Sequence, residues 1–265
     1  MGRQLDKELV IKNKKEAIQE INKTLERLIN SGSDKYLKKA DVISFWLKEY
    51  SRYIQNEENF NYKRVMHYKR GDVVQLNFGF NIGSEHGGLH YAIVLDNNNI
   101  QSSPVITVIP LSSGTKETTY ERDIYLGNEL YDKLKIKYDR CLELLKNDKK
   151  EHHILTMMAA QLETSNSGQE LNDENNEELK LLLKNKATDI EQRERQLNRF
   201  TKEIERLKNG SVALMEQITT VSKMRIYKPK SSKDLLYNVK FSDGAMEKIN
   251  ERLIELFVHS DKYNG

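Results

Sequence analysis

Residues 69–80 read KRGDVVQLNFGF, and this alternation of apolar and polar side chains is typical of a β-strand with one buried face. HYAIVLD at 90–96 is a continuous apolar run and predicts a buried strand. SSPVITVIPLSS at 102–113 is rich in β-branched residues and predicts a third strand, and TYERDIYLG at 119–127 predicts a fourth. The loop GSEHGGL at 83–89 is the only glycine-rich part of the sequence, which indicates tight backbone geometry there.

Strand-like sequence returns after residue 209. SVALMEQITTV at 211–221 and KMRIYKP at 223–229 predict further strands, and AMEKINERLIELF has apolar residues at helical spacing. We therefore expect one β-rich core, assembled from residues 68–127 and 210–260 and split by the segment between them.

The intervening segment, residues 128–209, has a helical pattern. Its second half repeats apolar residues at a strict seven-residue interval: Leu183, Ile190, Leu197 and Ile204. A polar stretch, TSNSGQELNDENN at 164–176, separates the two halves. The pattern predicts an antiparallel helical hairpin that recruits a partner or extends a dimer, and its nearly balanced charge indicates a solvated surface.

Residues 1–60 also read as helices. Two apolar stripes at three- and four-residue spacing are separated by SGSD at 31–34, which predicts a pair of amphipathic helices. This N-terminal helical extension is predicted to restrain the β-rich core in cis, because a tethered segment has a high effective concentration. An additional structural or dimerising pair is the alternative.

The composition excludes several classes of protein. With 31% charged and 37% hydrophobic residues in 265, the chain is polar but not disordered. A single cysteine, Cys141, excludes an intramolecular disulfide and a cysteine-based zinc or iron–sulfur cluster. No apolar run reaches about 18 residues, so we expect no membrane span, and an N-terminus without an apolar signal core predicts a cytoplasmic protein. A net charge of +3 creates no global field that indicates a nucleic-acid partner.

Five motifs in this order resemble the MazF/PemK family of bacterial toxins. They are RGD at 70–72, GSEHGG at 83–88, IVLDN at 93–97, SPV at 103–105 with the strand that follows it, and SVALMEQITTVS at 211–222. The resemblance implies an α+β protein whose SH3-like β-barrel is split by the hairpin and preceded by the N-terminal helices. It also implies a homodimer, and it does not extend to residues 1–60 or 128–208.

The resemblance implies a metal-independent endoribonuclease that needs no cofactor. It would cleave single-stranded RNA, such as mRNA, by attack of a ribose 2′-hydroxyl on the adjacent phosphate, and an antitoxin protein would be its partner. One alternative is a catalytically impaired member that binds RNA or a protein without cutting. Another is a sister family with the same fold that poisons DNA gyrase, for which DNA would be involved.

The family's catalytic pair is an arginine just after the glycine loop and a threonine or serine at the end of the SPT strand. By position these are His90 and Ser112 in this chain, which reads GGLHY at 87–91 where the family usually reads GGxRP. An arginine is a fixed cation, whereas a histidine can transfer protons near neutral pH. In the structural alternative, His90 makes a hydrogen bond at the start of a strand and Ser112 belongs to a turn.

Six further residues are predicted to bind substrate: Arg70, Glu85, His86, Ser113, Gln217 and Arg225. Arg225 lies in a basic stretch from Lys223 to Lys240 that also contains Tyr227. Cations beside an aromatic ring suit single-stranded RNA, and a solvated basic loop is the alternative. No metal site is expected, because the β-rich core has no carboxylate or histidine cluster with ligand spacing.

Overall fold

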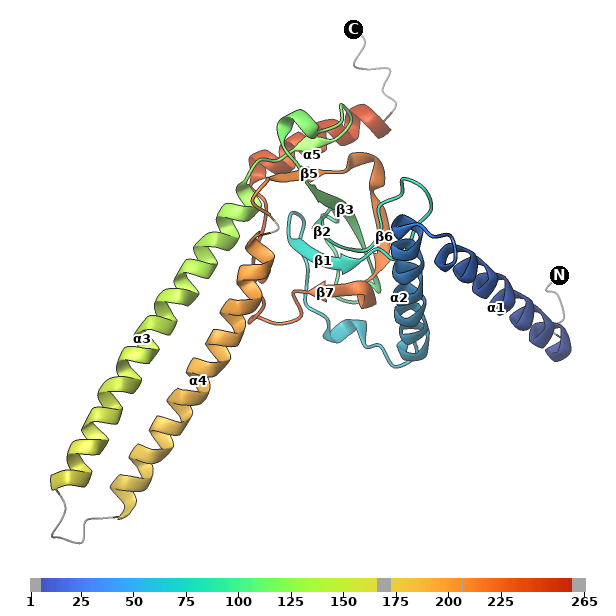
Figure 1. Cartoon of the computed structure of the whole chain (residues 1–265). Helices are drawn as coiled ribbons and strands as arrows, with labels where there is room; N and C mark the ends of the chain where they lie inside the picture. Colours follow the sequence, from blue (N-terminus) through green and yellow to red (C-terminus); the bar gives the residue numbers. More distant parts are fainter. Residues whose placement is uncertain (1–5, 166–172, 206, 259–265) are drawn as a thin grey trace. The chain divides into compact units, whose positions relative to one another are not determined.

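The structure, a computed structural model, describes residues 6–165, 173–205 and 207–258 (Figure 1). The chain packs into two compact units. One consists of Met1–Asn61 with Phe78–Gly88, and the other of Tyr62–Asn77 with Leu89–Gly265. Most of the polar stretch predicted between the long helices lies outside the described residues. The three-part division predicted from the sequence stays a prediction.

The larger unit contains an antiparallel sheet. Its strands are β1 Val73–Asn77, β2 Leu89–Val94, β3 Val105–Ser113, β4 Ile124–Tyr125, β5 Ser211–Ala213, β6 Thr219–Ser222 and β7 Ile226–Lys228. The order is β4-β5-β3-β2-β1-β7, with β6 paired to β3. The α+β class is confirmed. Within the described residues, no pairing joins the two ends of this order, so closure into an SH3-like barrel is not confirmed.

Strand β3 changes partners along its length, and this positions the site. It pairs with β2 only from Val94↔Val108 to Ala92↔Pro110, and its last three residues pair with β5 instead. Pro110 lacks a backbone N–H and cannot donate to a ladder. The ladder between β2 and β3 therefore ends there, and the first half of β2 separates from the end of β3.

The helical segment forms the predicted hairpin of α3 Glu129–Ser165 and α4 Asp173–Glu205, which lie side by side (Figure 1). A second row at seven-residue spacing on α4 contains two cations, Lys186 and Arg193, between Leu179 and Phe200, and the structure gives the reason. The Asp148 carboxylate on α3 accepts hydrogen bonds from Lys186 Nζ at 3.1 Å and Arg193 Nε at 2.7 Å. This paired charge cluster favours one register between the helices.

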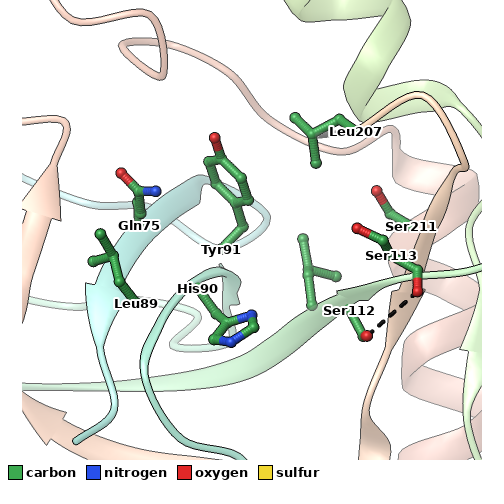
Figure 2. A pocket seen from close by; sticks show the side chains of 9 residues that line it. Gln75, Leu89, His90, Tyr91, Ser112, Ser113, Leu207 and Ser211 are labelled. Carbon is green, nitrogen blue, oxygen red and sulfur yellow. Dashed lines mark hydrogen bonds between the residues drawn. The ribbon is translucent and has the colours of Figure 1, made fainter. Parts of the chain in front are cut away.

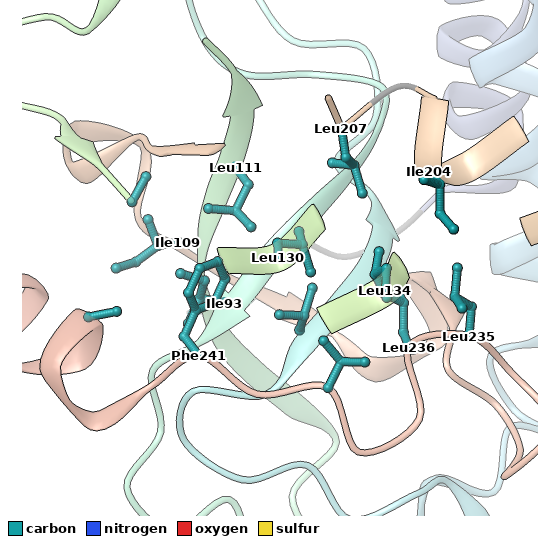
Figure 3. Close-up of a cluster of buried hydrophobic side chains, with 14 of the residues drawn as sticks. Ile93, Ile109, Leu111, Leu130, Leu134, Ile204, Leu207, Leu235, Leu236 and Phe241 are labelled. Carbon is teal, nitrogen blue, oxygen red and sulfur yellow. The ribbon is translucent and has the colours of Figure 1, made fainter. Parts of the chain in front are cut away.

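The ends of the hairpin nearest the sheet belong to the main hydrophobic core (Figure 3). Ile93, Ile109 and Leu111 of the sheet share this core with Leu130 and Leu134 of α3. From α4 and the turn after it come Leu197, Phe200, Ile204 and Leu207, and α5, Asp243–Phe257, adds Met246 and Ile249. Only the distal part of the hairpin can therefore be independent of the sheet.

The smaller unit contains the predicted helical pair, α1 Lys7–Ile29 and α2 Asp34–Asn56. The pair has a small core of Leu28, Ala40 and Ile43, against which Phe80 of the loop between β1 and β2 packs. Most of the α1 stripe is not covered in the described structure, and Ile18 is 58% exposed.

Short 3₁₀ turns complete the chain: η1 Tyr62–Arg64, η2 Lys116–Thr118, η3 Met215–Gln217 and η4 Lys223–Arg225. Among the helices that the structure describes, none combines the length and the apolarity that crossing a membrane requires.

Candidate active site

A pocket of about 430 Å³ opens where β2 and β3 separate. Strands β1 and β2 supply one wall, and the end of β3 supplies the opposite wall (Figure 2). Leu207, after α4, and Ser211, at the start of β5, complete the pocket. The full lining is Gln75, Leu89, His90, Tyr91, Leu111, Ser112, Ser113, Leu207 and Ser211.

The two predicted catalytic residues both line this pocket. Continuing the β2–β3 register past Ala92↔Pro110 would place His90 opposite Ser112, at the point where the ladder has ended. Figure 2 shows both side chains on the same side of the pocket. Ser112 Oγ makes only a long contact, 3.4 Å, to the Ser113 carbonyl, so its hydroxyl can reorient towards a ligand. The structure thus brings the pair together, and their catalytic roles stay predictions.

Six residues of the pocket were missed by sequence reasoning: Leu89, Tyr91 and Leu111, which are chain neighbours of predicted residues, and Gln75, Leu207 and Ser211. Gln75 lies on β1 opposite Tyr91 of β2, in a strand whose pattern indicated only packing. Leu207 lies at the C-terminal end of the helical insertion and Ser211 lies just after it. Both are more than 90 residues along the chain from β3. Only the pairing of β5 with β3 brings Ser211 here, and no local motif signals it.

A family comparison identifies the segment that carries the predicted pair. Residues 69–168 match the PemK-like, MazF-like toxins of type II toxin–antitoxin systems. The resemblance drawn from the motifs is thereby confirmed for this segment, which spans β1 to β4 and the whole of α3, so the match extends beyond residue 127, where the motifs had indicated no resemblance. No curated protein matches the chain at a significant level.

Glu85 and His86 lie in the β1–β2 loop of the PemK-like segment. This loop belongs to the unit of α1 and α2, and neither residue lines the pocket. The loop is braced internally: Asn81 Nδ2 donates to the His86 carbonyl at 2.6 Å, and the Ile82 amide donates to Glu85 Oε2 at 3.2 Å. The His86 ring meets Phe78 edge to face, with 5.3 Å between centroids. Their binding roles stay predictions.

Arg70, from the RGD motif, lies elsewhere on the larger unit. Its guanidinium donates to the Leu95 carbonyl and to Asn250 Oδ1 of α5, so it links the start of β1 to the C-terminal helix. Gln217 in η3 and Arg225 in η4 are half-buried and also lie outside the pocket lining. Of the six predicted substrate-binding residues, only Ser113 lines the pocket.

The basic stretch after residue 222 has fewer cations available to bind RNA than its sequence suggests. Lys223 is 2% exposed, its Nζ donates to the Ile100 carbonyl at 3.2 Å, and burial lowers its pKa. Lys228 forms an ion pair with Glu203 of α4. These two lysines stabilise the fold, whereas Tyr227 and Lys230 remain exposed.

The pocket therefore offers an imidazole, a phenol, three serine hydroxyls and one carboxamide. Such groups transfer protons and form hydrogen bonds to phosphate, ribose and base atoms. In the part of the chain that the structure describes, no three His, Cys, Asp or Glu side chains are grouped so that they could hold a metal ion.

Proposed function

We propose that this protein is an endoribonuclease toxin that cleaves single-stranded RNA, such as mRNA, without a metal ion or other cofactor. The observation that carries the proposal is the presence of His90 and Ser112 in one pocket of the segment that matches the toxin family. An SH3-like barrel, a homodimer and a separate antitoxin are the further parts of this proposal.

In the proposed reaction, a ribose 2′-hydroxyl attacks the adjacent phosphorus and displaces the 5′-oxygen of the next nucleotide. The products are a 2′,3′-cyclic phosphate and a 5′-hydroxyl. The His90 imidazole accepts the proton of the attacking hydroxyl or gives one to the leaving oxygen, because a histidine exchanges protons near neutral pH. The Ser112 hydroxyl donates a hydrogen bond to a phosphate oxygen on which negative charge develops.

A second candidate function is binding without cleavage. The specific observation in its favour is that the chain carries a histidine, His90, where the family usually has arginine. A neutral imidazole stabilises a pentacovalent phosphate dianion less than a fixed guanidinium does.

Incubation of the purified protein with a long RNA separates the two functions. We expect cleavage products with 5′-hydroxyl ends, and we expect the rate to be the same with excess EDTA as with magnesium, since the proposed proton transfers use only side chains. Cleavage that stops with EDTA and returns with magnesium would refute the metal-independent mechanism. Intact RNA under all conditions would favour the binding function.

We further propose that α1 and α2 restrain the toxin in cis through the β1–β2 loop. The support is the packing of loop residues on these helices. A Cβ atom on Gly79 would lie 2.8 Å from the Trp46 ring, Phe80 packs on the small helical core, and Lys39 lies 5.9 Å from the Phe80 ring centroid. The loop leads directly into β2, which carries His90, so a restraint on the loop also restrains the start of that strand.

Trp46→Ala tests this restraint. The loss of the indole beside Gly79 should loosen residues 78–88, so we expect faster hydrogen exchange in the loop. We also expect cleavage to be about 3- to 10-fold faster, which corresponds to the release of a local restraint of about 1 kcal/mol. Phe45→Ala is the matched control, because the neighbouring Phe45 is 63% exposed. Slower cleavage by Trp46→Ala would contradict the restraint and would show that α1 and α2 hold the β1–β2 loop in the conformation that cleavage needs.

A further inference from the structure

The pocket contains two buried polar side chains that the proposed reaction does not use. Gln75 is 6% exposed and Ser211 is 2% exposed, and both line the pocket. Among the described residues, no hydrogen bond joins the Gln75 carboxamide or the Ser211 hydroxyl to another group, and neither side chain has a fully enclosed unpaired polar atom, so their polar atoms open onto the pocket. Polar atoms that open onto a pocket are satisfied there by water or by a ligand, so these two groups are available for hydrogen bonds to a polar ligand.

The charge of the lining limits what that ligand is. Apart from the titratable His90, the described residues around the pocket are all neutral: no lysine, arginine, aspartate or glutamate lines it. Near Gln75 the walls are the apolar surfaces of Leu89 and Tyr91, with Leu207 opposite. A flat, uncharged group with apolar faces and a polar edge fits these surroundings, and an unstacked nucleobase has this chemistry.

A carboxamide presents one acceptor and one donor side by side. Adenine presents the complementary pair, because its N6 amine donates and the neighbouring ring nitrogen accepts, and bidentate pairing of glutamine with adenine is a common form of base recognition. A serine hydroxyl adds an adaptable donor or acceptor.

We propose that the Gln75 end of this pocket is a subsite for an adenine base of the RNA substrate, bound through its polar edge by the Gln75 carboxamide, with Ser211 as a second hydrogen-bonding group. The inference rests on the proposed endoribonuclease function and names a specificity-determining residue for it. In Figure 2, Gln75 and Tyr91 lie apart from the His90 and Ser112 side chains. Neighbouring residues of a strand point to opposite faces, so Gln75 and Tyr91 face one way and His90 the other, and all three line the same pocket, which opens where β2 leaves β3.

Binding is measured with RNA that cannot react, so that the result does not depend on cleavage. The probes are fluorescent five-nucleotide oligomers of 2′-O-methyluridine whose central base is adenine, unsubstituted purine, guanine, cytosine or uracil. We expect the full-length protein to bind the adenine oligomer about 5- to 150-fold more tightly than the purine oligomer, which lacks the N6 amine. Equal affinity for adenine and purine, tighter binding of another base, or no binding of any oligomer would overturn the proposal.

The variant Gln75→Met keeps the size of the side chain and removes both hydrogen-bonding groups. Its ratio of purine to adenine dissociation constants should fall to about one, and it should stay folded, because an unpaired buried carboxamide is removed. Ser211→Ala should weaken adenine binding by a smaller factor. Gln55→Met, an exposed position on α2, is the control and should keep the wild-type ratio. Retention of the adenine preference by Gln75→Met would contradict the assignment.

Failure of the proposed function is distinguishable from failure of this subsite. If wild-type protein prefers adenine through Gln75 but leaves unmodified RNA intact, the adenine subsite stands and the endoribonuclease proposal falls. If unmodified RNA is cleaved but adenine and purine bind alike, the reverse holds.

Discussion

Replacement of His90 by alanine is expected to lower the single-turnover rate of RNA cleavage about 10²- to 10⁴-fold, the usual effect of one positioned proton-transfer group. The expectation follows from its place in the pocket beside Ser112, where no other described lining side chain can titrate near neutral pH. The measurement is cleavage of one RNA with enzyme in excess, so that product release does not limit the rate.

The pH profile distinguishes proton transfer from charge stabilisation. As a general base His90 must be neutral, so the rate should rise with pH through the histidine pKa, about 6.5 when unperturbed. As a general acid it must be protonated, and the rate should fall through the same range. His90→Ala should remove that limb of the profile.

His90→Arg restores the residue usual in the toxin family. Its guanidinium stays charged across the measured range, so that limb of the pH profile should become flat. If His90 acts only as a cation for the phosphate, His90→Arg should be fully active at neutral pH and the wild-type rate should rise as pH falls.

His153→Ala on α3 is the matched control, because that histidine is exposed and lies outside the pocket lining. It should cleave at the wild-type rate. Wild-type activity in His90→Ala as well would end the catalytic assignment.

Much of the sheet could be predicted because its residues carry local signals. The alternation in residues 69–80 and the β-branched run at 102–113 encode buried strands, and β1 and β3 lie within them. SVALMEQITTV was predicted to be strand-like, and the structure forms strands at its two ends. It divides into β5, the turn η3 and β6, because β3 pairs with β5 at its end and with β6 at its start, and Met215 in the turn is fully buried.

The site could be predicted only in part, for a different reason. His90 and Ser112 were found through the order of the motifs, which fixes their place along two neighbouring strands. The positions of Gln75 and Ser211 depend on where β2 leaves β3 and on which strand pairs next, and these are properties of the assembled sheet. Glu85 and His86 sit in a loop that packs with α1 and α2, which no motif of the loop itself signals.

Replacement of the whole of residues 128–208 by a glycine–serine turn is expected to abolish cooperative unfolding. It would remove eight buried side chains from the core that contains the sheet, including six at the ends of α3 and α4 nearest the sheet: Leu130, Leu134, Leu197, Phe200, Ile204 and Leu207. Burial of each of these six contributes about 1.5–3 kcal/mol, so their loss, about 9–18 kcal/mol, is comparable to the whole stability of a domain, about 5–15 kcal/mol. Thermal unfolding followed by circular dichroism checks this.

Replacement of residues 147–195 alone should leave a folded protein. This cut removes Asp148 together with Lys186 and Arg193, so no charged partner is stranded, and it keeps all six core side chains and the buried Leu145. If this variant also lost its unfolding transition, the distal hairpin would be needed for the fold.

The shortened variant also tests what the distal hairpin does. Leu207 lines the pocket and is retained, so RNA cleavage should continue at the wild-type rate if the distal helices only recruit a partner or extend a dimer. Wild-type and shortened protein compared by light scattering then show whether the distal hairpin holds two copies together. A folded, monomeric variant without cleavage would mean that the catalytic pocket is completed by a second copy held through α3 and α4.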